Sequence, residues 1–254
     1  MITLVRFMVR KSVVLSMVLL SGVVNGAEPD AGADTWSNQL IIYLLGPTLD
    51  GEVGLGPLEA EVDMGTSDIF DALDGAFLGM YRGEGERWGV LLDVVYMNLK
   101  ADAQGPLGAL SGTVSNKQTT VLASASYRVS ENTRLLAGVL YADITAKARL
   151  DGPLESRQGK AGESWVDPVV GVLYNRALGS RWDLTGLAQV GGFGVGSDLT
   201  YVLTGSVAYQ ISARTSISLG YRYLDFDYED GTGADRFLFD MKQHGPAVGF
   251  RFSF

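Results

Sequence analysis

The stretch Gly245-Pro-Ala-Val-Gly-Phe-Arg-Phe-Ser-Phe254 contains the clearest indication of the fold. Its side chains alternate in character with a period of two, which predicts a β-strand with one apolar and one polar side. The apolar side carries Val248, Phe250, Phe252 and Phe254, and the other carries Ala247, Gly249, Arg251 and Ser253. Strand ends that face water are normally polar, so the aromatic end at Phe254 favours a strand whose apolar side faces lipid and whose other side faces a small or wet lumen.

The rest of the chain has the spacing of a closed barrel. Short connections at 84–87, 130–133, 179–181 and 212–214 alternate with longer or glycine-rich ones at 101–113, 150–163, 191–198 and 229–241. Short turns at one end and long loops at the other are typical of transmembrane β-barrels. We therefore predict an all-β fold over 38–254, an antiparallel up-and-down transmembrane barrel of ten strands, with eight or twelve as alternatives. The strands are expected at 38–49, 74–84, 87–100, 114–129, 133–149, 163–178, 181–194, 198–212, 215–229 and 242–254.

The alternation within these strands supports a lipid-facing surface. Trp88, Val90, Leu92, Val94 and Tyr96 share one face of a single strand, with Gly89 and Asp93 on the other. A soluble β-sandwich would also alternate, but it needs neither an export signal nor the asymmetry of turns and loops.

The region 50–73 is open to two interpretations. Its first part, Gly51 to Gly65, is either a turn-rich extension of the first strand or an extracellular loop. Its second part, 67–74, predicts a short helix that Ser67 caps and that presents Ile69, Phe70 and Leu73 on one face. In a barrel such a helix would cover or enter the lumen.

The N-terminus predicts an export signal. Basic residues (Arg6, Arg10 and Lys11) precede an apolar run over 13–24, and small residues follow. The run spans roughly 18 Å as a helix, which is short for a hydrocarbon core of about 30 Å, so a cleaved signal is favoured over an anchor. We expect a signal peptide over 1–26, with cleavage after residue 27 as the alternative, and a short segment over 27–37.

Composition excludes several classes of protein. The chain has 254 residues, 33 glycines and 10% aromatic residues, and its mean hydropathy is +0.14, which is too polar for a helical membrane protein. It has no cysteine, so a disulfide scaffold, a lipoprotein anchor and thiol catalysis are excluded. The net charge of −9 argues against nucleic acid as a partner.

Several motifs are similar to those of a known family. They are Trp165-Val-Asp-Pro-Val-Val-Gly171, Gly191-Gly-Phe-Gly-Val-Gly-Ser-Asp198, Gly220-Tyr-Arg-Tyr-Leu-Asp-Phe-Asp-Tyr228, Gly245-Pro-Ala-Val-Gly249, Ser67-Asp-Ile-Phe70 and Arg87-Trp-Gly89. Together they resemble a family of Gram-negative outer-membrane β-barrel proteins, of the porin-like or OmpA-like small-barrel class. The resemblance covers nearly all of the chain after the signal and implies a fold, with periplasmic turns and extracellular loops, but no activity.

The resemblance also implies a location and partners. The last strand is similar to the closing strand that the barrel-assembly machinery reads, which makes Phe250, Phe252 and Phe254 the expected assembly signal. The expected location is the outer membrane, with membrane lipid and lipopolysaccharide around a monomeric barrel. Periplasmic chaperones are expected partners during biogenesis.

No motif predicts catalysis, a cofactor or a metal. Gly191-Gly-Phe-Gly-Val-Gly196 resembles a dinucleotide-binding loop, but no βαβ unit surrounds it, so a tight hairpin loop is expected. The sole histidine, His244, and the pair Asp225 and Asp227 resemble half of an omptin-type site, without an acid two residues before the histidine. Asp225, Asp227, Glu229 and Asp230 are expected to form a solvated acidic rim, with a weak calcium site as the alternative.

Five charged residues are expected to face the lumen. They are Asp93, Arg128, Asp183, Arg222 and Arg251. Buried charges must pair, so these residues predict a closed, salt-bridged core in which Asp93 meets Arg222 across the barrel, or a narrow pore that uses the same residues. The expected function is that of a non-enzymatic outer-membrane barrel for envelope structure, adhesion or passage of small solutes. An omptin-like or lipid A deacylase-like hydrolase is the alternative.

Overall fold

The computed structural model describes residues 36–104, 111–151 and 156–254. The predicted signal peptide over 1–26 and all but the last two residues of the 27–37 segment lie outside the described residues. No helix in the described part is long and apolar enough to cross a membrane.

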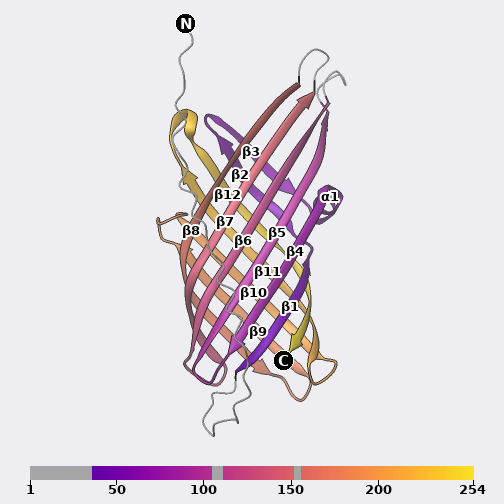
Figure 1. Ribbon diagram of the computed structural model, residues 1–254, viewed down its shortest axis with the longest axis vertical. Helices are drawn as coiled ribbons and strands as arrows, with labels where there is room; N and C mark the ends of the chain where they lie inside the picture. Colours follow the sequence, from indigo (N-terminus) through magenta and orange to yellow (C-terminus); the bar gives the residue numbers. More distant parts are fainter. Residues whose placement is uncertain (1–35, 105–110, 152–155) are drawn as a thin grey trace, which may run out of the picture. The chain divides into compact units, whose positions relative to one another are not determined.

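Ten antiparallel strands form a closed barrel, as predicted (Figure 1). Each strand pairs with its neighbour around the barrel, and β1 pairs with β12 to close it. The barrel strands are β1 (Ser37–Leu45), β4 (Leu73–Glu84), β5 (Trp88–Gln104), β6 (Ser111–Arg128), β7 (Thr133–Asp151), β8 (Ser156–Ala177), β9 (Trp182–Gly192), β10 (Leu199–Gln210), β11 (Thr215–Asp230) and β12 (Phe237–Ser253).

The two ends of the barrel differ as the connections predicted. The connections β4–β5, β6–β7, β8–β9 and β10–β11 are short and lie at one end, which we call the turn end. The start of β1 lies there too, since Ser37 pairs with Glu84 beside the β4–β5 turn. The C-terminus lies next to it, because Asn38 and Phe254 exchange backbone hydrogen bonds of 3.2 and 3.0 Å. The remaining connections lie at the opposite end, the loop end, and one of them contains the 3-10 helix η2 (Gly233–Asp235).

The strands alternate between an outer and an inner face. On β5 the predicted outward residues from Trp88 to Tyr96 are exposed or half-buried, whereas Leu91, Asp93 and Val95 point inward and are buried. Trp88 remains 60% exposed, which is the arrangement that a lipid-facing surface needs.

Residues 48–64 extend the wall as a separate hairpin. The predicted first strand, 38–49, is too long: β1 ends at Leu45, and Gly46 and Pro47 interrupt it, because proline has no N–H to donate to the ladder. The chain resumes as β2 (Thr48–Leu55) and β3 (Leu58–Met64). β2 pairs with the loop-end part of β12, as β1 pairs with its turn-end part.

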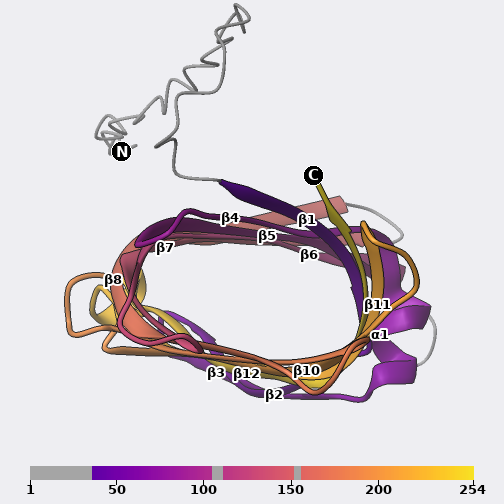
Figure 2. The same ribbon diagram turned by 90° about the horizontal axis from the view of Figure 1, so that it is seen from below.

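The short helix α1 (Thr66–Ala72) follows β3. Gly65 is its N-cap and its amide donates to Asp68 Oδ2 at 3.0 Å, so the predicted cap, Ser67, was wrong by two residues. Ile69 is 1% exposed, whereas Phe70 is 53% exposed. Figure 2 shows α1 at the side of the barrel, outside the ring of strands, so it covers part of the wall and does not enter the lumen.

At the loop end the wall consists of two sheets with a notch on each side. The β9–β10 hairpin is short, so residues 156–168 of β8 pair only with β7, and residues 228–230 of β11 pair only with β12. We call this interval the β8/β11 notch. On the other side β4 pairs with β5 only up to Leu99, and β3 pairs only with β2 within the described chain. We call this interval, with α1 at its base, the β3/β5 notch.

Candidate functional site

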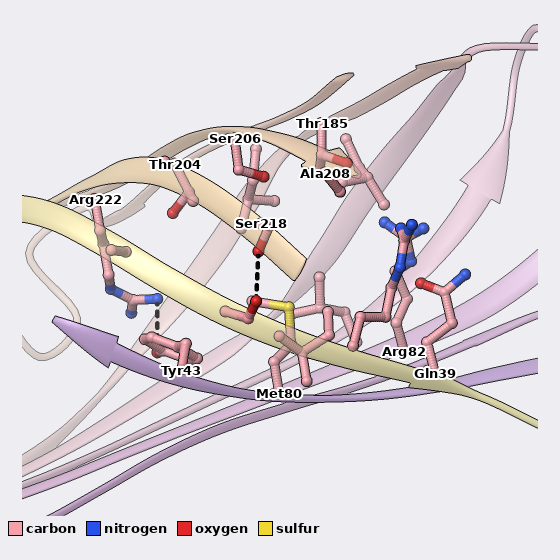
Figure 3. A pocket seen from close by; sticks show the side chains of 18 residues that line it. Gln39, Tyr43, Met80, Arg82, Thr185, Thr204, Ser206, Ala208, Ser218 and Arg222 are labelled. Atoms are coloured by element: carbon pink, nitrogen blue, oxygen red, sulfur yellow. Dashed lines mark hydrogen bonds between the residues drawn. The ribbon is translucent and has the colours of Figure 1, made fainter. Parts of the chain in front are cut away.

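An ion pair crosses the middle of the lumen. Arg222 on β11 places Nη1 2.5 Å from Oδ2 of Asp93 on β5. Tyr43 on β1 donates its hydroxyl to Asp93 Oδ1 at 2.8 Å and accepts from Arg222 Nη1 at 3.1 Å. We call these three residues the central crossing; Figure 3 shows Arg222 and Tyr43 on one side of a lumen cavity.

The central crossing is deeply buried. The side chains of Arg222 and Asp93 are 5% and 1% exposed, so each charge depends on its partner. The structure therefore brings together the two residues that the sequence placed opposite each other. Tyr43 was not predicted, although the outward positions of Ile42 and Leu44 imply that it points inward.

The other predicted lumen charges lie toward the turn end. Arg251 donates to Asp183 Oδ2 at 2.8 Å and to the Ser216 hydroxyl at 3.1 Å. Arg128 ends β6, is exposed, and lies opposite Arg134 in the ladder. The five residues thus do not form one network: they comprise two separate pairs and one exposed arginine.

A turn-end cluster that the sequence analysis missed lies near them. Arg82 and Arg134 each place Nε 3.4 Å from Oε1 of Glu84, and both arginines are buried. Arg82 also donates to Asn175 Oδ1 at 2.9 Å, and Arg134 donates to the carbonyl oxygen of Gly85 at 2.8 Å. A cavity of about 100 Å³ lies between this cluster and the central crossing (Figure 3).

A buried carboxylate closes the lumen side of the β9–β10 loop. Asp167 on β8 is fully buried and accepts from the Ser197 amide at 2.7 Å, the Ser197 hydroxyl at 2.7 Å and the Thr200 hydroxyl at 2.8 Å. The Trp165 indole donates to it at 3.2 Å. The loop that resembled a dinucleotide site is a tight turn, with Phe193 and Gly194 at φ values of 55° and 71°. Ser197, near the end of this loop, donates to Asp167, and these hydrogen bonds hold the β9–β10 connection against β8.

Toward the loop end the inner face becomes apolar, which corrects the expectation of a polar lumen. Gln118 and Gln243 exchange hydrogen bonds of 3.1 and 2.5 Å across the barrel. Beyond them lies a cavity of about 410 Å³, which we call the loop-end cavity. Most of its lining residues are apolar; they include Leu49, Val53, Val62, Met64, Leu99, Ile144, Phe239 and Met241.

An aromatic group closes the β8/β11 notch from inside. Trp165 on β8 stacks on Tyr228 on β11, with ring centroids 4.0 Å apart. Phe226 and Phe239 pack edge-on or tilted against the same indole, at 5.6 and 6.1 Å. These contacts replace the missing strand pairing on that side.

His244 lies on the outer face of the wall, not in the lumen. Its Nδ1 is 2.7 Å from the Tyr221 hydroxyl and 3.1 Å from the Thr48 hydroxyl, and its Nε2 is 3.2 Å from Asp50 Oδ2. These contacts join β2 to β11 and β12 at the end of the apolar band.

The residues of the predicted acidic rim lie toward the loop end of β11, where Asp227, Glu229 and Asp230 are exposed and Asp225 is half-buried. Asp225 lies on the outer face and accepts from the Tyr223 hydroxyl at 2.7 Å, and Glu229 pairs with Arg236 at 2.5 Å. Arg236 also pairs with Glu59 of β3 at 2.5 Å. The hydrogen bond that Arg236 donates to Glu229 and, to a smaller extent, the one that it donates to Glu59 raise the pKa of its guanidinium. Among the described side chains no group of three or more acids and histidines has the geometry of a metal site.

Comparison with known proteins gives matches of fold only. No family model matches the chain, and no curated protein matches it. The outer-membrane protease OmpT from Escherichia coli is similar in structure, with a TM-score of 0.51 and 9% identity over 89% of this chain and 99% of that one. The fold is that of an outer-membrane β-barrel.

Two further solved structures are similar at lower TM-scores. Ail, the attachment invasion locus protein of Yersinia pestis, matches with a TM-score of 0.36 and 15% identity over 86% of this chain and 98% of that one. The translocator domain of the autotransporter NalP from Neisseria meningitidis matches with a TM-score of 0.44 and 12% identity, over 87% and 88%.

Proposed function

We propose that this chain is a non-enzymatic, monomeric outer-membrane barrel whose lumen is sealed, and that it contributes to the structure of the envelope. The turn end faces the periplasm and the loop end faces the outside. The observation that carries the proposal is the central crossing, because Arg222, Asp93 and Tyr43 span the lumen and are nearly inaccessible to solvent. The assembly machinery and its chaperones would read Phe250, Phe252 and Phe254.

Further polar contacts support a sealed lumen. Gln118 and Gln243 cross it on the loop side of the ion pair, and Arg82, Arg134 and Glu84 fill it on the turn side. A small barrel has room for interlocking side chains and little water. The neutral hydrogen bonds between Gln118 and Gln243 are weaker than those of a buried ion pair, so the central crossing is the main barrier to passage of small solutes along the axis.

Planar-bilayer recording of the refolded mature protein tests the proposal. We expect no stable conductance steps from the unmodified protein and defined steps from Arg222→Ala, with Arg214→Ala, at the exposed β10–β11 turn, as the matched control. Well-defined open steps in the unmodified protein would refute a sealed lumen. Unheated protein should also migrate differently from boiled protein on a gel, because a closed barrel has no free edge from which to unfold.

The hydrolase alternative rests on the contacts of His244. A hydroxyl and a carboxylate lie on opposite ring nitrogens, from Thr48 and Asp50. However, the Thr48 hydroxyl also lies 3.1 Å from the backbone oxygen of His244, to which it donates. The group lies on the outer wall, where it holds β2 in place. Lipid or peptide hydrolysis that disappears in His244→Ala would favour this alternative.

A further inference from the structure

The loop-end cavity is an apolar space inside a barrel. Outer-membrane barrels usually have polar interiors that hold water. Here eight of the lining residues are the aliphatic, Met and Phe side chains named above, and the cavity measures about 410 Å³. An open apolar cavity favours apolar ligands, because their binding removes apolar surface from water, and pockets for small ligands begin at roughly 300 Å³.

The cavity is closed at its floor and at the β8/β11 notch. Its floor contains the Gln118–Gln243 pair, below which lies the central crossing. The β8/β11 notch is closed by the stack of Trp165 on Tyr228. A ligand therefore enters from the loop end or through the β3/β5 notch.

The cavity reaches the β3/β5 notch. Lining residues come from both flanks, among them Val62 and Met64 of β3 and Leu99 and Lys100 of β5. Ala72 of α1, at the base of the notch, lines it as well. No strand pairing joins the two flanks in the part of the chain that the structure describes.

The base of the notch lies where the outer surface changes from apolar to charged. Below it, Phe77 and Tyr96 are cross-strand partners on the outer face. Above it, the outer positions are charged, with Lys100 on one flank and Glu61 on the other. A membrane that covers the apolar band would therefore place its headgroups at this height, and an acyl chain could leave the lipid sideways while its head stays in the polar layer.

The β5 side of the notch carries a positive charge, whereas β3 and α1 are acidic (Glu61, Asp63, Asp68 and Asp71), so an anionic head would lie on the β5 side. Lys100 is exposed, lines the cavity and has no ion-pair partner among the described side chains. On the same outer face, further around the wall, Lys147 of β7 lies directly opposite Lys160 of β8. Lys117 is exposed on the strand between them and β5.

We propose that the loop-end cavity binds the hydrocarbon chain of a fatty acid, which enters through the β3/β5 notch and leaves its carboxylate beside Lys100. This site is independent of the sealed lumen, because it lies on the loop side of both polar crossings. A barrel that conducts ions could still hold the fatty acid, and a sealed barrel could lack the site.

Trp165 provides an internal probe for the test. Its ring lies 6.1 Å from that of Phe239, which lines the cavity. The other tryptophans, Trp36, Trp88 and Trp182, are exposed on the barrel surface. In a variant with these three replaced by phenylalanine, a fatty acid brominated along its chain should quench the remaining fluorescence saturably when added to protein in saturated-lipid vesicles.

Ala146→Phe should abolish the saturable quenching, because the new ring would occupy the cavity that Ala146 lines. Thr145→Phe is the matched control, since the adjacent residue points to the other face and should leave quenching unchanged. Quenching that is equal in both variants, or that never saturates, overturns the proposal. Heat-dependent migration on gels shows that each variant is folded; if Ala146→Phe is not, Ala161→Phe on the paired strand repeats the test.

Three further arms identify the ligand. Lys100→Glu should weaken binding of the brominated fatty acid several-fold and leave binding of its methyl ester unchanged. Equal effects on the acid and the ester would refute the contact with the carboxylate. Brominated phosphatidylcholine should not quench the fluorescence saturably. If it does, and Ala146→Phe removes that quenching, the occupant is a bilayer lipid and the proposal of a free fatty acid is wrong.

Discussion

The two halves of the lumen use the same strands but place their apolar side chains on opposite faces of the wall. In the turn-end half the outer face is apolar, and the inner face holds charges such as Arg82, Glu84 and Arg222. In the loop-end half the outer face is charged and the inner face is apolar, around Trp165 and Phe239. The apolar side therefore changes from the outer to the inner face along single strands.

Strand β5 shows this change within one element. Trp88 and Val90 are exposed on its outer face near the turn end, whereas Leu99 is buried on the inner face and Lys100 is exposed near the loop end. Where lipid surrounds the barrel, the outer face must be apolar. Beyond that level, two separate sheets face each other in water and need an apolar interface, as the sheets of a sandwich do.

The largest effect should come from the ion pair of the central crossing. Arg222→Ala leaves the Asp93 carboxylate buried without its partner, which should reduce the free energy of unfolding by about 3–5 kcal/mol. The double variant Asp93→Ala/Arg222→Ala should recover part of that loss. Urea unfolding in micelles, followed by the gel shift, measures both. Single effects that simply add would show that the two residues are uncoupled.

A second, smaller loss is expected at the boundary between the halves. Asp167→Ala leaves several buried donors without an acceptor, including the Ser197 amide and the Thr200 hydroxyl, at a cost of about 1–3 kcal/mol. Hydrogen exchange should rise in the β9–β10 loop. Asp167→Asn, which keeps a carbonyl acceptor, should lose less. Equal stability of Asp167→Ala and the unmodified protein would contradict the role assigned to this carboxylate.

A third change distinguishes a packed core from a water-filled lumen. Ile144 is 3% exposed in the loop-end half, so Ile144→Val should cost about 0.5–1.5 kcal/mol. Val139→Ala, on the outer face of the same strand, is a control whose effect depends on the surrounding lipid or detergent. No loss at Ile144 would mean that the loop-end half is not an apolar core.

The smallest effect on stability is expected at the C-terminus. Phe254 is 62% exposed and bonds to Asn38 only through the backbone. Deleting it should leave refolding in detergent near normal but lower the abundance of the protein in the outer membrane, as quantified by immunoblotting of membrane fractions. Normal abundance in cells would show that Phe254 is not needed for assembly.

The sequence predicted most of the turn-end half. Alternation with a period of two predicts which residues point inward. The number of residues between each of them and its short turn predicts its position along the barrel axis, so Asp93 and Arg222 could be placed opposite each other. The predicted starts of β8 and β12, at 163 and 242, were too late. The early part of β8 extends its pairing with β7, and the early part of β12 pairs with β11 and with the distant strand β2.

The loop-end half was largely missed, for physical reasons. The β2–β3 hairpin pairs with β12, nearly the whole chain away, and no local pattern specifies that contact. Asp167 acquires its role from Ser197 and Thr200, which a loop brings to it. The one available signal was the charge of outward positions such as Lys100 and Lys117, which marks where the lipid-facing band ends.

The division of the lumen can be measured directly, because the chain has no cysteine. Single cysteines at Ala146, in the loop-end cavity, and at Ser206, in the turn-side cavity, report on the two halves. In vesicles whose outer surface presents the loop end, an external charged thiol reagent should label Ala146→Cys and leave Ser206→Cys unlabelled. Ser206→Cys should become labelled when Arg222→Ala is added. Labelling of both cysteines at equal rates with Arg222 in place would contradict a lumen divided at the central crossing.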